Sequence, residues 1–192
     1  MFKTIVISNQ KGGVGKSALA YYLGLKFKEV SEIAFVDTDL QGTLHSFKEN
    51  SNIDTYTIDD LDTIDKNKYN FLIIDTPPYL SKELPSIIKN ADLILIPTKI
   101  GLPDFYSMEK TINMIKGFGK EKESLIVFNM VEQKTKILEQ ISGVLDDYNI
   151  PIAKTKIHNR IAYQRGYITL ELDNKAQKEI DNLSLEIISK LV

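Results

Sequence analysis

The chain has 192 residues, 43% of them hydrophobic and 26% charged, and its formal net charge is -2 at pH 7. These values are ordinary for a globular domain, and so small a net charge gives no overall attraction to nucleic acid or to a membrane. The absence of cysteine fits a reducing cytoplasm and excludes disulfides, thiolate metal sites, iron–sulfur clusters and cysteine nucleophiles, and no apolar stretch approaches the ~18 residues of a membrane span.

Short apolar runs alternate with helix-like stretches along the chain. We predict strands over 3–8, 33–37, 71–75, 92–97 and 124–129, with a weaker strand near 152–157. We predict helices over 16–29, 82–90, 104–117, 133–147, 160–165 and 173–191, the last of them capped by Asp173 or Asn174. Residues 48–69 are polar and receive no assignment.

Several predicted strands are apolar along their whole length, for example 71–74 and 93–96. Strands of this kind are buried on both faces, which is typical of a parallel sheet with helices on each side. We therefore predict one α/β domain over residues 1–192, with a doubly wound, mostly parallel sheet. Ligands bind beyond the carboxyl ends of the strands in such sheets, so the residues after each strand are the candidate site residues.

The first strand leads into the glycine- and lysine-rich segment SNQKGGVGKSALA, residues 8–20. Glycines let backbone N–H groups converge on an anion, and a helix that begins near Lys16 adds the positive end of its dipole. This order predicts a phosphate-binding loop, in which Lys16 reaches the β/γ-phosphates of ATP and Ser17 ligates Mg²⁺. The match to the G-x-x-x-x-G-K-[ST] pattern is imperfect, because Gln10 stands where the first glycine belongs. The nucleotide-binding residues are predicted to be Gly12, Gly13, Val14, Gly15, Lys16, Ser17 and Ala18.

Acidic residues follow the next two buried strands. Asp75 comes after four apolar residues, the expected setting for an acid that holds Mg²⁺ opposite Ser17, although Pro77 and Pro78 would also favour a plain polar turn there. Asp37 and Asp39 follow the second strand, where one could orient the water shell of the metal and the other the water that attacks the γ-phosphate. An ordinary acidic turn is the alternative for this pair.

These three motifs together resemble the deviant Walker A ATPases of the ParA/MinD type, which have the P-loop NTPase fold. The resemblance lies in KGGVGKS (11–17), DTDLQG (37–42) and IIDTPP (73–78). It implies that Lys11 is the signature lysine, which reaches across a nucleotide-sandwich homodimer to the phosphates bound by the other subunit. Such a lysine would offset the repulsion between two facing ATP molecules. Lys11, Lys16 and Asp39 are then the catalytic residues.

The resemblance also assigns roles to the remaining candidates. It favours Asp39 as the acid that positions water and places Asp37 nearer the metal, so that Ser17, Asp37 and Asp75 form the metal set. The family commonly has proline where this chain has Leu40, which makes the conformation of that loop less certain. Asn129 resembles the asparagine that contacts adenine in the family, with a turn-forming asparagine as the alternative.

The branches of this family differ in what the ATP dimer holds. The last helix mixes lysines with acids and lacks aromatics, which favours a core-packing helix over a basic helix on a membrane surface. Residues 161–171 resemble the late segment of small partition ATPases, and we expect no N-terminal helix-turn-helix domain. The resemblance thus implies a cytoplasmic, nucleoid-associated ATPase that binds DNA non-specifically and acts with a separate centromere-binding activator. A membrane-associated positioning switch and a metabolic P-loop enzyme are the alternatives.

A net acidic chain must hold DNA by a local patch rather than by its overall field. Residues 148–170 contain no Asp or Glu and hold both arginines of the sequence. We therefore predict that DNA phosphates contact Lys154, Lys156, Arg160 and Arg165. The alternative is that these groups pair with acids elsewhere in the fold.

Overall fold

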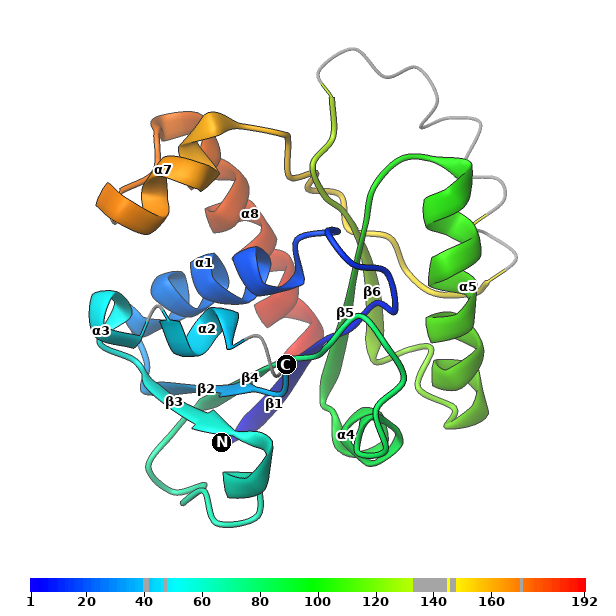
Figure 1. Ribbon diagram of the computed structural model, residues 1–192, viewed down its shortest axis with the longest axis horizontal. Coiled ribbons are helices and arrows are strands. Elements are labelled where there is room, and N and C mark those ends of the chain that lie inside the picture. Colours follow the sequence, from blue (N-terminus) through cyan, green and yellow to red (C-terminus); the bar gives the residue numbers. More distant parts are fainter. Residues whose placement is uncertain (40–41, 47, 133–144, 146–147, 170) are drawn as a thin grey trace.

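The computed structural model describes residues 1–39, 42–46, 48–132, 145, 148–169 and 171–192 (Figure 1). Six strands form one sheet in the order β3-β2-β4-β1-β5-β6, and every pair of neighbours is parallel. The strands are β1 (Lys3–Ile7), β2 (Ile33–Asp37), β3 (Asp54–Thr57), β4 (Phe71–Asp75), β5 (Leu93–Thr98) and β6 (Ser124–Phe128). This arrangement confirms the predicted doubly wound, parallel α/β fold.

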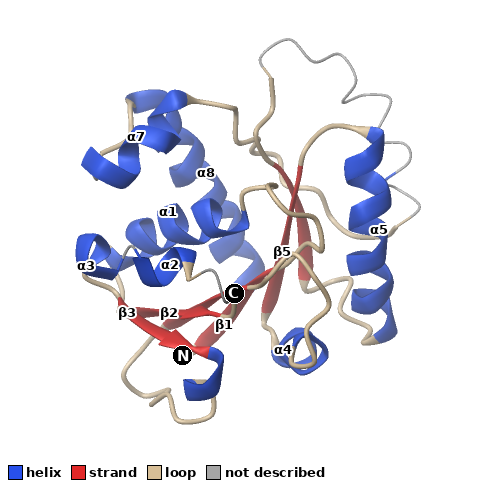
Figure 2. Cartoon of the chain, in the orientation of Figure 1, coloured by secondary structure: helices blue, strands red, loops and turns tan. Residues whose placement is uncertain are grey.

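Helices cover both faces of the sheet (Figure 2). The helices are α1 (Lys16–Lys28), α2 (Thr43–Ser46), α3 (Lys48–Ser51), α4 (Leu84–Asn90), α5 (Leu102–Gly117), α7 (Ile161–Thr169) and α8 (Asn174–Leu191), with a 3-10 turn at Ile58–Asp60. Helices α1 and α8 pack on one face of the sheet, and α4 and α5 pack on the other.

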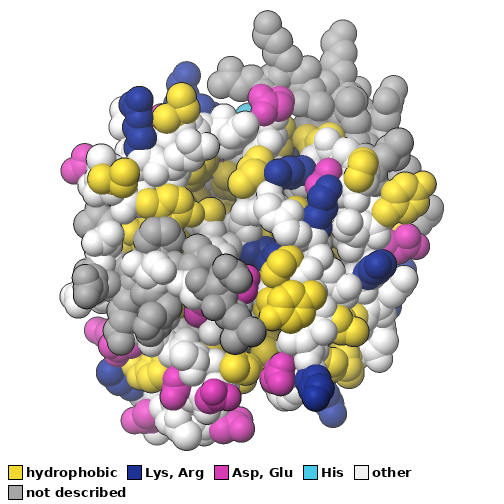
Figure 3. All heavy atoms as spheres, in the orientation of Figure 1, with side chains coloured by type: hydrophobic (Ala, Val, Ile, Leu, Met, Phe, Trp, Pro, Cys, Tyr) yellow, Lys and Arg dark blue, Asp and Glu magenta, His cyan; other side chains and the backbone are white. Residues whose placement is uncertain are grey.

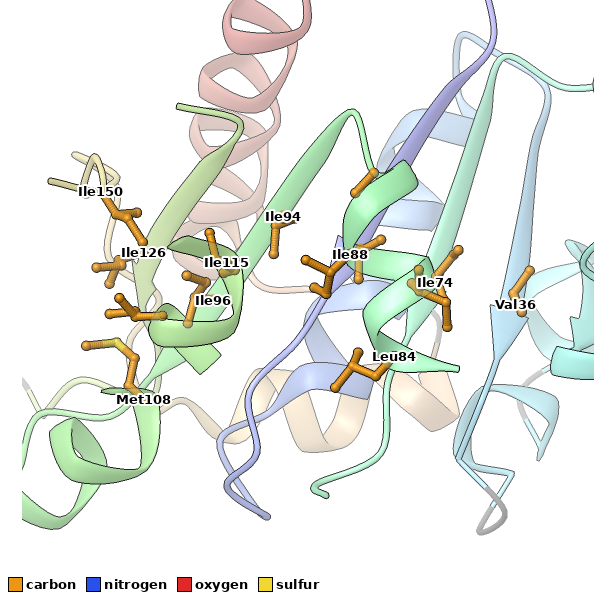
Figure 4. Packing of buried hydrophobic residues seen from close by; sticks show 14 of the residues in the cluster. Val36, Ile74, Leu84, Ile88, Ile94, Ile96, Met108, Ile115, Ile126 and Ile150 are labelled. Carbon is orange, nitrogen blue, oxygen red and sulfur yellow. The ribbon is translucent and has the colours of Figure 1, made fainter. Parts of the chain in front are cut away.

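Two hydrophobic clusters form because successive strand residues point to opposite faces of the sheet. On β5, Ile94 and Ile96 contact the α4 and α5 side, as Figure 4 shows, whereas Leu93 and Leu95 face α1 and α8. The central strands are therefore buried on both faces, which is the physical reason for their continuous apolar sequence.

The last helix packs into the core as predicted. Asp173 caps α8, because its carboxylate accepts hydrogen bonds from the backbone N–H groups of Lys175 and Ala176. Leu183 and Ile187 are fully buried against the sheet. Among the described residues, no helix is long and apolar enough to cross a membrane.

The structure differs from the predicted elements in several places, among them the short helix α2, which no prediction covered. The edge strand β3 lies in the polar stretch 48–69 that received no assignment. Residues 152–157, all of them described, form a single bridge at Ile152 rather than a strand, because the Glu186 carboxylate on α8 takes the N–H groups of Lys154 and Thr155. The helix predicted at 160–165 is the longer α7. The helix predicted at 133–147 falls largely outside the described residues.

Candidate nucleotide-binding site

The carboxyl ends of three neighbouring strands meet at one edge of the sheet. Strand β4 lies between β2 and β1, and Asp75 is in register with Ile7 on one side and with Asp37 on the other. The loop from Ser8 to Gly15 leaves β1 at the same edge and leads into α1. The predicted gathering of a glycine-rich loop and carboxylates is therefore present.

Two glycines allow this loop to turn into the helix. Gly13 and Gly15 have φ angles of 69° and 86°, in the left-handed region that favours glycine. A Cβ atom on Gly15 would also lie 2.3 Å from the amide nitrogen of Asn129. Since Gly15 is the N-cap residue of α1, the first N–H groups of the helix face the loop, which is a geometry that suits a phosphate.

Lys16 is the first residue of α1, and its side chain folds back over the loop. Its ammonium group donates a hydrogen bond of 3.2 Å to the carbonyl oxygen of Lys11. The residue is 7% exposed, and burial lowers the pKa of Lys16, although the charges of Asp75 and Asp39 oppose this shift. A desolvated cation of this kind gains by contact with an anion such as a phosphate.

Asp75 is the most unusual ionisable group at this edge. It is completely buried, and burial is the main cause that raises the pKa of Asp75 to about 7, with Asp37 and Asp39 contributing and Ser17 and Lys16 opposing. Within the described residues, neither carboxylate oxygen makes a hydrogen bond of ordinary geometry, although the Ser17 hydroxyl lies close enough to lower the pKa. A buried carboxylate with spare lone pairs beside a hydroxyl is a suitable donor set for Mg²⁺.

The described residues contain no group of three or more carboxylate, histidine or cysteine side chains that could hold a metal alone. This fits Mg²⁺, which is usually held by one or two protein oxygens together with water and substrate phosphates. Ser17 and Asp75 therefore fit the ion as part of a site that a nucleotide completes.

Asp37 shapes the turn after β2. Its two carboxylate oxygens accept hydrogen bonds from the backbone N–H groups of Asp39, at 3.1 Å, and Leu44, at 2.8 Å. Asp37 is buried and fixes the path of the chain that carries Asp39, whose charge acts on Lys16. The positions of both acids agree with the predicted site, while their roles toward metal and water stay predictions.

Asn129 follows β6 and joins this strand to the phosphate loop. Its side-chain amide donates to the carbonyl oxygen of Val14 at 2.7 Å, and its oxygen accepts from the N–H group of Met130 at 3.0 Å. The amide nitrogen of Asn129 keeps one further N–H donor, and its oxygen keeps one further lone pair. The predicted contact with adenine is therefore compatible with these bonds and stays a prediction.

A cavity of about 70 Å³ lies beside the loop. Its lining includes Ala18 and Tyr22 from α1, Asn129 and Met130 after β6, and Gln164 from α7. The mixture of aromatic, apolar and amide groups suits a flat heterocycle that carries hydrogen-bonding edges.

Lys11 has a partner that the sequence analysis missed. Its ammonium group lies 2.7 Å from the carboxylate of Asp104 in the first turn of α5, and its N–H group donates to the side-chain oxygen of Asn9. Asp104 follows the buried strand β5 at the same edge of the sheet, and no role was predicted for it. An acid soon after a buried strand was the available signal.

The predicted DNA-binding residues lie on the segment before α7 and on α7 itself. The guanidinium group of Arg160 pairs with Glu179 on α8, through bonds of 2.6 and 3.0 Å from two of its nitrogens. Arg165 and Lys154 are exposed, and Lys156 is half-buried. For Arg160 the structure therefore shows the alternative, in which the cation pairs with an acid of the same chain. Basic and acidic side chains are interspersed over the face in Figure 3.

Comparisons with known proteins agree with this geometry. The model of the CobQ/CobB/MinD/ParA nucleotide binding domain matches residues 5–170. The maintenance of carboxysome distribution protein A of Halothiobacillus neapolitanus is 22% identical over 208 residues, which cover 98% of this chain and 96% of that protein.

Two solved structures have the same fold. One is a protein of Borrelia burgdorferi B31 described as a plasmid partition protein, bound to AMPPNP, with a TM-score of 0.78, 19% identity and 100% coverage of both chains. The other is the MinD cell division protein of Aquifex aeolicus, with a TM-score of 0.73, 14% identity and 97% coverage of both chains. The whole chain therefore has a fold that is shared by one protein described for plasmid partition and another described for cell division.

Proposed function

The chain belongs to the CobQ/CobB/MinD/ParA family of nucleotide-binding domains, and from this premise we propose that it is an ATPase that forms a homodimer on ATP and then binds DNA. In this proposal it positions plasmid or chromosomal cargo, and a separate centromere-binding protein stimulates its ATP hydrolysis. Its place in the cell would be the nucleoid within the cytoplasm.

One observation carries the proposal for ATP. The buried carboxylate of Asp75, which makes no hydrogen bond of ordinary geometry within the described part of the chain, and the buried ammonium group of Lys16 lie beside a glycine loop at a helix N-terminus. In the absence of a ligand such a site lowers the stability of the folded protein, because an ionised carboxylate and an ammonium group are both removed from water. Bound ATP with Mg²⁺ would supply the charges that the two groups lack.

The roles of the residues follow from where they lie. Ser17 and Asp75 would hold Mg²⁺, which neutralises phosphate charge when bound, and Asp37 would order the neighbouring turn or the water shell of the metal. Lys16 would contact the β/γ-phosphates, and Asp39 would orient the attacking water. The cavity next to Asn129 would receive the base.

Dimerisation would complete the catalytic site. Lys11 lies at the rim of the loop, and in the proposed dimer it contacts the phosphates that the other subunit binds. The phosphate motifs themselves contain no arginine, so turnover by the chain alone should be slow until a partner protein acts.

Two substitutions test this nucleotide-dependent dimer. Lys11→Ala should bind ATP but fail to dimerise or to hydrolyse ATP normally, whereas Asp39→Ala should form a long-lived ATP dimer. Size-exclusion chromatography with light scattering in ATP and Mg²⁺ measures both. A Lys11→Ala variant that dimerises and hydrolyses ATP like the wild type would contradict the proposed role in trans.

The proposed DNA contacts concentrate on α7 and on the segment that precedes it. Arg165 is exposed, and two copies of α7 in a dimer would present twice as many cations to the phosphates, which couples DNA affinity to ATP. Arg160 would have to share its guanidinium group between Glu179 and DNA, so Arg165 is the cleaner position to test.

DNA binding on a random-sequence duplex should therefore require ATP and weaken in Arg165→Ala. The slope of log affinity against log salt should flatten by roughly one for each DNA phosphate that the variant no longer neutralises. Lys89→Ala on α4 is the matched control, since it removes an exposed cation on the other face of the sheet. Equal affinities and slopes for both variants would place the DNA surface elsewhere. ATP-independent DNA binding would contradict the proposed coupling.

The fold does not favour the membrane-associated alternative. A helix that binds a membrane surface must present its apolar face to the lipid. In α8 that face, with Ile180, Leu183 and Ile187, is buried against the sheet. Sedimentation with anionic vesicles in ATP should leave the chain in the supernatant, and co-sedimentation would revive the alternative.

A further inference from the structure

Lys11 is held at three points of its own subunit, one of which is the hydrogen bond from its N–H group to the side-chain oxygen of Asn9. Its ammonium group forms the ion pair with Asp104, and its carbonyl oxygen accepts the hydrogen bond from the ammonium group of Lys16. The side chain of Lys11 is 31% exposed and that of Asp104 only 11%. The carboxylate is thus the buried member of the pair, and the lysine approaches it from the open side.

The backbone at the start of α5 fixes the position of Asp104. The aspartate stands in the first turn of the helix, where the helix dipole favours a negative charge, and its N–H group donates to the carbonyl oxygen of Gly101. A Cβ atom on Gly101 would lie 3.0 Å from a carboxylate oxygen of Asp104, so the glycine leaves room for this carboxylate. The acid is therefore fixed, while the long side chain of Lys11 can move.

We propose that Asp104 is a positioning residue that holds Lys11 within its own subunit and competes with the phosphates of the other subunit for this cation. The proposal rests on the proposed ATP dimer. Each subunit would exchange the Lys11–Asp104 pair for a Lys11–phosphate contact on assembly. The exchange leaves a buried carboxylate without its partner, and this cost opposes dimerisation.

Nucleotide binding would begin the exchange inside one subunit. A phosphate in the loop draws the ammonium group of Lys16 away from the carbonyl oxygen of Lys11. One backbone anchor of Lys11 is then released before a second subunit arrives, while the bond from its N–H group to Asn9 and the pair between its side chain and Asp104 remain. ATP binding thus releases one backbone contact of Lys11, and the pair with Asp104 is the restraint on its side chain that only dimerisation exchanges.

The test compares dimer dissociation constants of full-length variants with AMPPNP and Mg²⁺, measured by sedimentation velocity over a concentration series. Asp104→Asn removes the charge and keeps the shape, and Asp104→Glu keeps the charge. Asp92→Asn is the matched control, because Asp92 forms a lysine–aspartate pair with Lys3 before β5, at the opposite edge of the sheet. AMPPNP affinity of the monomer is measured for each variant at low concentration.

Asp104→Asn should lower the dimer dissociation constant by about tenfold, since two pairs are exchanged per dimer and each is worth roughly threefold. Asp104→Glu and Asp92→Asn should stay near the wild type, and monomer affinity for AMPPNP should not change. An unchanged or raised dimer dissociation constant in Asp104→Asn would overturn the proposal. A wild type that stays monomeric in AMPPNP would refute the ATP dimer itself, and the exchange with it.

A measurement on the wild type does not depend on the folding of any variant. Lysine ammonium groups in ion pairs give resolvable nitrogen-detected NMR signals, and the signal absent from Lys11→Arg identifies Lys11. We expect this signal to change position between the nucleotide-free monomer and the AMPPNP dimer. An identical signal in both states would show that Lys11 keeps Asp104 and would overturn the exchange.

Discussion

Replacing Glu179 by glutamine should destabilise the protein through one network of hydrogen bonds. One oxygen of Glu179 accepts from two nitrogens of Arg160 and lies 2.8 Å from the Nδ1 atom of His158. The other accepts from the Tyr163 hydroxyl, at 2.9 Å, and from the N–H group of His158. Glutamine offers only one acceptor oxygen, so it cannot satisfy both sets, and the guanidinium group loses its hydrogen-bonded counter-charge and keeps, among the described residues, only the more distant charge of Asp173.

The magnitude follows from the burial of the pair. The side chains of Glu179 and Arg160 are only 12% and 16% exposed, so the cation left behind in Glu179→Gln is largely desolvated. Removing one member of a buried pair costs about 3 kcal/mol of unfolding free energy. In a chain of this length that loss lowers the melting temperature by roughly 6–12 °C.

Urea unfolding at pH 7 without nucleotide measures this loss. Glu186→Gln is the control, because Glu186 lies about two turns further along α8 and, among the described residues, its carboxylate accepts hydrogen bonds from neutral groups of Lys154 and Thr155 alone. Its loss should be about 1 kcal/mol. Equal losses in the two variants would refute the reasoning that the counter-charge matters.

The Arg160–Glu179 pair also makes the unfolding free energy depend on pH. Burial acts to raise the pKa of Glu179, but the hydrogen bonds from Arg160, His158 and Tyr163 outweigh it and lower the pKa below its ordinary value of 4.5. A lowered carboxyl pKa stabilises the folded state above the ordinary value, and this contribution is lost as the pH falls through the folded-state pKa. The difference in unfolding free energy between wild type and Glu179→Gln should therefore shrink in acid, and a difference independent of pH would contradict the assignment.

Three further substitutions test the site and the core. Lys16→Ala should abolish ATP binding, because the phosphates lose their main side-chain partner, and micromolar affinity in calorimetry would disprove the loop assignment. Asp75→Asn should stabilise the nucleotide-free protein at pH 8 by on the order of 2–4 kcal/mol. The pKa of Asp75 is raised to about 7 in the folded protein. Ionisation of Asp75 therefore lowers the unfolding free energy of the wild type by an amount that grows as the pH rises from about 4 to 7. The same variant should lose ATP hydrolysis with Mg²⁺, and a gain in stability that does not change between pH 5 and 8 would argue against this cause. Leu183→Ala should cost 2–5 kcal/mol in urea unfolding, since the side chain is fully buried, and a loss below about 1 kcal/mol would argue against a core role for α8.

Local patterns were sufficient to predict the fold class and the central motifs. Continuous apolar runs identify strands that are buried on both faces, and glycines before Lys16 and Ser17 identify a loop at a helix N-terminus. Because parallel strands end at the same edge of a sheet, the sequence also predicted that Asp75 would lie near this loop. These inferences need only short-range information.

Edge and connecting segments were not predictable in the same way. Strand β3 has a polar sequence because only part of it is buried, so its pattern resembles a loop. At 152–157 an apolar pattern suggested a strand, but Glu186 from a distant helix binds the backbone N–H groups that a strand would use.

The partners of the charged residues were decided by the tertiary structure alone. Lys11 and Asp104 are 93 positions apart in the chain, and Arg160 and Glu179 are 19 apart. A sequence shows that cations and acids are present, but which of them pair depends on the order of the strands and on the helix that packs over each strand end. The sequence by itself determined that this chain has a glycine-rich loop with a lysine at its rim. The packing of α5 on β5 determined where that lysine lies, because ion pairing acts over a few ångströms that only the folded chain brings together.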